Sequence, residues 1–122
     1  MRRLLIVHHT PSPHMQEMFE AVVSGATDPE IEGVEVVRRP ALTVSPIEML
    51  EADGYLLGTP ANLGYISGAL KHAFDVCYYP CLDTTRGRSF GAYFTATRAP
   101  REPSEPSTPS QPAWVGCKPL RL

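Results

Sequence analysis

Short runs of apolar residues alternate in this chain with segments whose apolar side chains recur every three or four positions. Leu4–Val7, the first run, is apolar at every position and ends at two histidines, which is typical of a strand buried on both faces of a sheet. Later runs rich in β-forming residues follow at Val34–Val37, Tyr55–Gly58 and Phe90–Phe94. Strands that alternate with helices in this way predict an α/β fold with a doubly wound parallel sheet.

Each intervening segment carries a helix-start signal. Ser12 is a candidate N-cap followed by Pro13, and Gly25 is expected to end this first helix. Ser45 precedes a proline and a glutamate in the pattern of a capping box, which predicts a short helix through Leu50. The next helix is expected to present one apolar face, made of Ile66, Leu70, Ala73, Phe74 and Cys77.

Composition excludes several classes of protein. With 11 basic and 13 acidic residues the formal charge is −2, so no strong attraction to nucleic acid or anionic lipid is expected. The run at Leu4–Val7 is too short for a membrane span or a signal-peptide core. Three cysteines make no disulfide framework, which favours a cytoplasmic location. His8, His9 and His14 match no common metal motif, so no metal is expected.

Two segments form the candidate ligand site, because ligands of open α/β sheets bind beyond the carboxyl ends of the strands. Thr10–Met15 follows the first strand and Pro60–Gly64 follows the third. The first segment opens a helix, whose free amides and dipole favour an anion such as a phosphate monoester. Its donors are the amides of Thr10, Ser12, His14 and Met15 and the hydroxyls of Thr10 and Ser12, since proline has no N–H. The alternative is an ordinary capped turn in which Ser12 serves only its own helix.

The second segment is rich in small residues. Gly64, and Gly68 beyond it, permit close approach of a ligand to the backbone. A loop that exposes amides beside apolar side chains suits a flat, amphipathic heterocycle. Asn62 is either a hydrogen-bond partner for the edge of such a ring or an ordinary surface residue.

A longer pattern runs from Gly58 to Asp75: Gly-Thr-Pro, three residues, Gly, two residues, Ser-Gly, two residues, Lys, two residues, Phe-Asp. With this pattern the chain resembles the flavodoxin-like NAD(P)H-dependent FMN reductases and NAD(P)H:quinone oxidoreductases, the WrbA-like family. The first segment is similar too, although Pro13 replaces a glycine of the family. The resemblance covers about residues 3–95 and implies a flavodoxin-like sheet with strand order 2-1-3-4.

The resemblance implies that FMN binds with its phosphate on the first segment and its ring against the second. It also implies that hydride passes from NAD(P)H via the flavin to a small-molecule acceptor, a quinone or a flavin. The implied cofactor-binding residues are Thr10, Pro11, Ser12, Pro13, His14, Met15, Pro60, Ala61, Asn62, Leu63 and Gly64. No side chain is assigned as a catalytic acid or base. Two alternatives stay open, a flavodoxin-type electron carrier and a flavin-free remnant that acts as an interaction module.

Residues 96–122 differ in composition from the domain predicted over residues 1–95. Prolines recur there at every third position, at Pro100, Pro103, Pro106, Pro109 and Pro112, which predicts an irregular, polyproline-type tail. The family has a third flavin loop, a fifth strand and the last helices in this region, and we expect these to be missing. A truncated or shifted reading frame near Phe94 is one hypothesis, and a genuine linker or partner-binding tail is the other. An incomplete sheet is expected to bind FMN weakly and to self-associate, which leaves a homo-oligomer open.

Overall fold

The computed structural model of the chain describes residues 1–96. The elements in this range are β1 (Arg2–His8), α1 (Pro13–Ala26), β2 (Val34–Pro40), α2 (Pro46–Glu51), β3 (Gly54–Asn62), β4 (Tyr65–Ile66), α3 (Gly68–Cys81) and β5 (Ser89–Ala96). None of these described helices has the length and apolar run that a membrane crossing needs. The tail predicted over residues 96–122 lies outside the described residues, apart from Ala96 at the end of β5.

All the strands belong to one mixed sheet. β1 lies between β2 and β3 and is parallel to both, and β5 runs parallel to β3 on its other side. The two-residue β4 pairs antiparallel with the end of β3, where Ala61 lies opposite Ile66. The predicted strand order is therefore confirmed, with the fourth predicted strand labelled β5 and with β4 as an addition that the residue pattern did not indicate.

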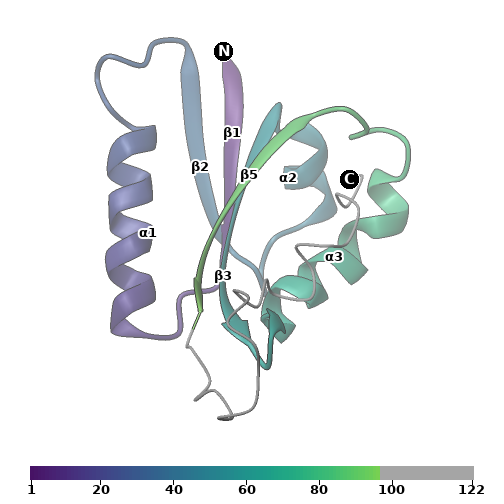
Figure 1. Cartoon of the computed structure of the whole chain (residues 1–122). Coiled ribbons are helices and arrows are strands. Elements are labelled where there is room, and N and C mark those ends of the chain that lie inside the picture. Colours follow the sequence, from purple (N-terminus) through teal and green to yellow (C-terminus); the bar gives the residue numbers. More distant parts are fainter. Residues whose placement is uncertain (97–122) are drawn as a thin grey trace, which may run out of the picture.

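Helices cover both faces of the sheet. Figure 1 shows α1 on one side and α2 and α3 on the other. Leu5, Ile6 and Val7 of β1 are all at most 1% exposed, as expected of a strand whose successive side chains enter two different cores. On the side of α2 and α3, the core includes Leu5, Val7, Met49, Tyr55, Leu57, Leu70, Ala73 and Cys77. Ile66, which we expected on the helix, lies in β4 instead.

Most of the predicted helix ends are confirmed. Ser12 caps α1, and Ser45 forms a complete capping box at the start of α2. The predicted stop at Gly25 is wrong, since α1 continues to Ala26. Thr27 closes the last turn instead: both its amide N–H and its hydroxyl donate to the carbonyl of Val23, at 2.9 and 2.7 Å.

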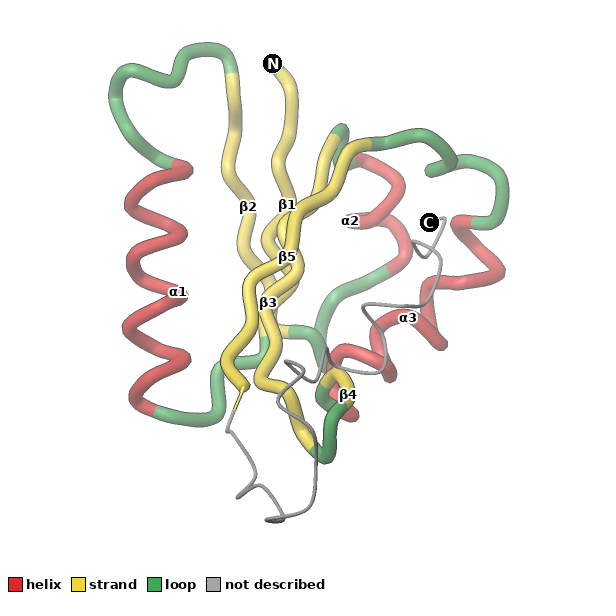
Figure 2. The backbone as a smooth tube through the Cα atoms, in the orientation of Figure 1, coloured by secondary structure: helices red, strands yellow, loops and turns green. Residues whose placement is uncertain are grey.

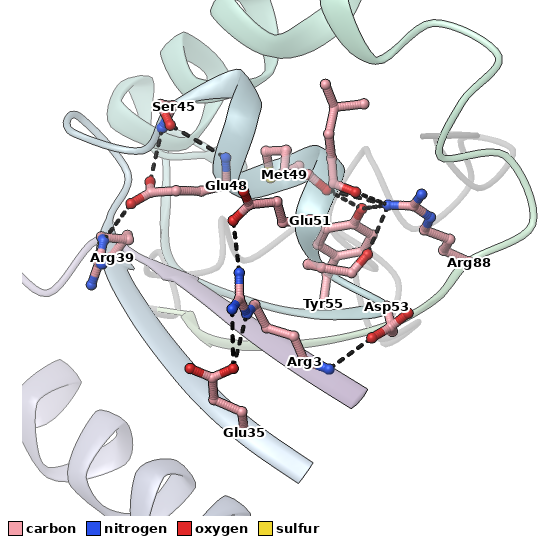
Figure 3. A network of polar contacts seen from close by, with 12 residues as sticks. Arg3, Glu35, Arg39, Ser45, Glu48, Met49, Glu51, Asp53, Tyr55 and Arg88 are labelled. Atoms are coloured by element: carbon pink, nitrogen blue, oxygen red, sulfur yellow. Dashed lines mark hydrogen bonds and ion pairs between the residues drawn. The ribbon is translucent and has the colours of Figure 1, made fainter. Parts of the chain in front are cut away.

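A network of charged side chains ties the elements together at the amino ends of the strands (Figure 3). Arg88, just before β5, donates from Nη1 to the carbonyls of Leu50 and Ala52 at 2.8 and 2.7 Å, and to the Tyr55 hydroxyl at 3.2 Å. A cation beside the last carbonyls of a helix is favourable, so Arg88 stabilises the end of α2. Arg3 of β1 forms ion pairs with Glu35 and Glu51 at 3.1 and 2.7 Å.

Candidate functional site

The first predicted segment connects the end of β1 to the start of α1. The His9 amide donates to the carbonyl of Gly58 at 2.9 Å, which continues the pairing of β1 with β3 by one residue. Ser12 then accepts the Met15 amide on Oγ at 3.3 Å and the Gln16 amide on its carbonyl at 2.9 Å. Within the segment, Met15 is buried, Thr10 is half-buried, and Pro11, Ser12, Pro13 and His14 are exposed.

His8 joins this segment to α1. Its ring stacks on Phe19 of α1 with 4.0 Å between centroids and 26° between planes, so this strand-end histidine packs against a helix. His8 Nδ1 lies 2.8 Å from Oγ1 of Thr10. Burial is the main cause that lowers the pKa of His8, and the charges of Arg38 and His9 lower it further. The imidazole is therefore neutral near pH 7.

The second predicted segment differs from the expected loop. Pro60, Ala61 and Asn62 belong to β3, and only Leu63 and Gly64 form a turn. The backbone groups of Gly58 and Pro60 face the same edge of β3, the edge that pairs with β1. Because β1 has ended before the chain reaches Pro60, the missing N–H of proline costs no hydrogen bond of the sheet. Pro60 is buried, Ala61 is half-buried, and Asn62, Leu63 and Gly64 are exposed.

The turn at residues 63–64 is a tight hairpin between β3 and β4. Leu63 has φ of +51° and Gly64 has φ of +73°, which is the backbone of a two-residue hairpin turn with both residues left-handed. Glycine adopts this conformation freely, whereas leucine is strained in it. The Leu63 side chain is fully exposed at the tip.

A buried pair of hydroxyl residues fixes the hairpin to α3. Oγ1 of Thr59 accepts the Ser67 amide at 2.9 Å and donates to the carbonyl of Pro60 at 2.8 Å. Ser67 in turn caps α3 by accepting the Leu70 amide on Oγ at 3.2 Å. Thr59 and Ser67 are 3% and 1% exposed. The Gly-Thr-Pro and Ser-Gly parts of the pattern thus meet in space.

The two segments lie at the same end of the sheet. Because β1 and β3 are parallel neighbours, their carboxyl ends meet at one edge, and the contact between His9 and Gly58 joins them there. Figure 2 shows the start of α1 and the β3–β4 hairpin at this end. The end of β5 reaches it too, since the Thr95 hydroxyl donates to Sδ of Met15 at 3.2 Å.

Residues 9–15 and 59–67 contain no aspartate, glutamate, lysine or arginine. An anion bound by these segments would therefore be held by backbone N–H groups, hydroxyls and the dipole of α1 rather than by ion pairs within them.

Tyr93 of β5 fills the space above Gly58. A Cβ atom built on Gly58 would clash with Cζ and the hydroxyl oxygen of Tyr93, so any larger residue at this position would force the Tyr93 ring to move. The hydroxyl is buried and has no hydrogen-bond partner among the described residues. Burial raises the pKa of Tyr93 to about 12.

Comparison with known proteins agrees with this geometry. No family model matches the chain. The flavodoxin of Aquifex aeolicus is 32% identical over 75 residues, which are 62% of this chain and 40% of that protein. An NAD(P)H dehydrogenase (quinone) of Acidithiobacillus ferrooxidans is 28% identical over 95 residues, which cover 62% of this chain and 46% of that protein.

A solved structure decides the fold. The flavodoxin, WrbA-like protein from Agrobacterium tumefaciens superposes with a TM-score of 0.62 at 20% identity, over 82% of this chain and 63% of that one. The chain has a flavodoxin-like fold. By sequence it is related to a flavodoxin and to an NAD(P)H dehydrogenase (quinone), and it spans less than two thirds of the length of each protein compared here.

Reasoning from the sequence missed three features of this candidate site. The contact of His8 with Thr10 joins residues only two positions apart, and no motif signals it. The Tyr93 ring lies over Gly58 because the strand register pairs these two residues. The hairpin had a signal in Gly64, which is followed by the β-forming pair Tyr65-Ile66.

Proposed function

We propose that the chain binds FMN and transfers hydride from NAD(P)H via the flavin to a quinone or flavin acceptor. The observation that carries this proposal is the position of Thr10–Met15 and of the β3–β4 hairpin at one end of the sheet, on neighbouring strands. Bound FMN would supply the hydride chemistry, while the protein supplies binding, orientation and polarity.

The first segment suits the phosphate. The Met15 and Gln16 amides are taken by Ser12, and Pro11 and Pro13 have no N–H. Ser12 uses its side-chain oxygen only as an acceptor in this cap, so its hydroxyl proton stays able to donate. The remaining donors are the amides of Thr10, Ser12 and His14 and the hydroxyls of Thr10 and Ser12, which together can surround a phosphate monoester.

The hairpin suits the ring. Its backbone at Asn62–Gly64 is exposed, so its amides and carbonyls are accessible to the polar edge of an isoalloxazine. The hydrogen bonds from the Ser67 amide to Thr59 and from the Leu70 amide to Ser67 hold this backbone in place relative to α3. A rigid, exposed backbone beside the apolar side chains of Leu63 and Tyr65 orients a flat amphipathic ring at low entropic cost.

A second candidate function is that of an electron carrier without nicotinamide chemistry. The observation that favours it is the 32% identity to a flavodoxin, against 28% to a quinone dehydrogenase. A flavin-free interaction module is the third candidate. A small-molecule acceptor, rather than nucleic acid or a membrane, and a cytoplasmic location stay predictions.

The test is a titration of the full chain with FMN, followed by absorbance and flavin fluorescence. Quenching with saturation supports binding, and its absence refutes the proposal in favour of the flavin-free module. The yellow complex is then mixed with NADPH or NADH without oxygen, and a quinone is added afterwards. Bleaching by the nucleotide and recovery with the quinone support the reductase, whereas bleaching by dithionite alone indicates the carrier.

A further inference from the structure

His8 occupies a position from which it acts on the proposed phosphate segment through Thr10. The strand fixes its backbone, and the stack on Phe19 fixes its ring. With the ring held, Nδ1 lies 2.8 Å from Oγ1 of Thr10, and this hydrogen bond orients the Thr10 hydroxyl toward the ring. Thr10 is half-buried, which leaves part of its side chain accessible from the segment.

The direction of this hydrogen bond decides what Thr10 offers to a ligand. A hydroxyl has one proton to donate and two lone pairs that accept. When Nδ1 carries the proton, it donates to Thr10, and the Thr10 hydroxyl proton is left for an anion. When Nδ1 is bare, it takes that proton, and Thr10 presents only lone pairs, which repel phosphate oxygens.

The surrounding groups favour control by tautomer over a permanent charge. Burial, Arg38 of β2 and the neighbouring His9 all disfavour the imidazolium form by lowering the pKa of His8. The ring also faces α1 through the uncharged Phe19, and the side chain of Tyr93 lies over Gly58, the residue opposite His8 on β3. A neutral ring has its proton on one nitrogen only, so its tautomer sets the donor count of Thr10.

We propose that His8 is a positioning residue for the phosphate of the flavin: its Nδ1–H donates to Thr10 and directs the Thr10 hydroxyl proton toward the ligand. This inference rests on the proposed function. The segment contains two prolines and no cation, so each remaining donor matters for affinity. His8 itself does not contact the ligand in this scheme.

The test is a double-mutant cycle on ligand affinity, with FMN and riboflavin as the two probes. His8→Phe keeps an aromatic ring against Phe19 and removes Nδ1, and Thr10→Val keeps the shape of Thr10 and removes the hydroxyl. Each single variant is expected to bind FMN about tenfold more weakly, the loss expected for one hydrogen bond to a charged group. The double variant is expected to be no weaker than either single one, because His8 acts through Thr10.

Riboflavin separates this role from a structural one. It lacks the phosphate, so its affinity is expected to stay within about twofold in all three variants. Thr10→Ser keeps the hydroxyl and is expected to retain most of the affinity for FMN. His72→Phe, at an exposed position on α3, is the matched control and is expected to change neither affinity.

Three results overturn the inference while leaving FMN binding intact: unchanged FMN affinity in His8→Phe, additive losses in the double variant, or equal losses for riboflavin and FMN. Failure of the unsubstituted chain to bind FMN overturns the proposed function and this inference with it. Thermal melting of each variant identifies a misfolded sample, and then Thr10→Ser against Thr10→Val decides the role of the hydroxyl.

Discussion

Tyr93→Phe is expected to stabilise the protein. The Tyr93 ring lies over Gly58, and its hydroxyl oxygen is buried with no hydrogen-bond partner among the described residues. In the unfolded chain the same hydroxyl is hydrogen-bonded to water, so folding costs its desolvation without return. Phenylalanine keeps the ring and removes the group that carries this cost.

The size of the effect follows from two opposing terms. An unsatisfied buried polar group costs about 1–3 kcal/mol. Removing the oxygen leaves a void of about methyl size, which costs about 1 kcal/mol. The net expectation is a gain of about 1 kcal/mol in the free energy of unfolding, or roughly 4 °C in Tm for a chain of this length.

The pH dependence gives a second, independent check. Burial raises the pKa of Tyr93 from its usual 10.0 to about 12. Between these values the unfolded chain loses the Tyr93 proton while the folded chain keeps it, so stability falls as the pH rises through this window and is unaffected below it. Tyr93→Phe lacks this loss, and its advantage over the unsubstituted chain is expected to grow from pH 9 to pH 11.

The assay is urea unfolding followed by circular dichroism at pH 7, 9 and 11. Tyr79→Phe is the matched control, because the Tyr79 side chain is 80% exposed and its loss is expected to change stability by less than about 0.5 kcal/mol. The reasoning is refuted if Tyr93→Phe is no more stable than the unsubstituted chain at pH 7. It is also refuted if both variants follow the same pH profile.

Three further predictions concern the rest of the fold. Arg88→Met removes the donor to the carbonyls of Leu50 and Ala52 and is expected to lower the free energy of unfolding, measured by urea unfolding, by about 2–3 kcal/mol. Arg88→Lys keeps a cation and is expected to recover part of this loss. Equal stability of the Arg88→Met and Arg88→Lys variants would contradict a stabilising role for these hydrogen bonds. Gly58→Ala is expected to lower the stability measured by thermal melting by about 1–3 kcal/mol, because the new Cβ meets the Tyr93 ring. In a Tyr93→Ala background the same substitution is expected to be nearly neutral. An equal loss of stability in both backgrounds would contradict the steric cause. Burial raises the pKa of the Cys77 thiol to about 11. After treatment with iodoacetamide at pH 8, peptide mapping is therefore expected to find Cys77 unmodified in the native protein and modified in urea. Rapid modification of Cys77 in the native protein would show an accessible thiolate and contradict this prediction.

The sequence predicted those elements that depend on local chemistry. The uniform run around Leu5 and Val7 requires two covered faces, and the structure covers both. Ser12 and Ser45 cap helices because a side-chain oxygen can reach an amide three residues ahead without tertiary help. Both candidate segments were also located at the correct end of the sheet, since strand direction alone decides this.

What the sequence could not predict depends on neighbouring strands. Thr59-Pro60 is typical of a turn, yet β3 continues through it because β5 pairs with one edge and β1 has ended on the other. Gly25 carries the composition of a helix stop, but the Thr27 contacts with Val23 override it. The Tyr93 hydroxyl lacks a partner among residues 1–96 because the strand register places Tyr93 opposite Gly58, and no local pattern encodes this register.

The placement of the ion pairs outside the two candidate segments has a practical consequence. Arg3 and its carboxylate neighbours attract one another through partly exposed ion pairs, which dissolved electrolyte screens over distances of about 10 Å at 0.1 M. The two candidate segments, residues 9–15 and 59–67, contain no aspartate, glutamate, lysine or arginine, although the ion pair of Arg39 with Glu48 lies at the same end of the sheet. Sodium chloride is therefore expected to weaken the ion pairs of Arg3 and Arg39 while leaving the hydrogen bonds of the two segments, which involve dipoles and hydroxyls, nearly as strong as before.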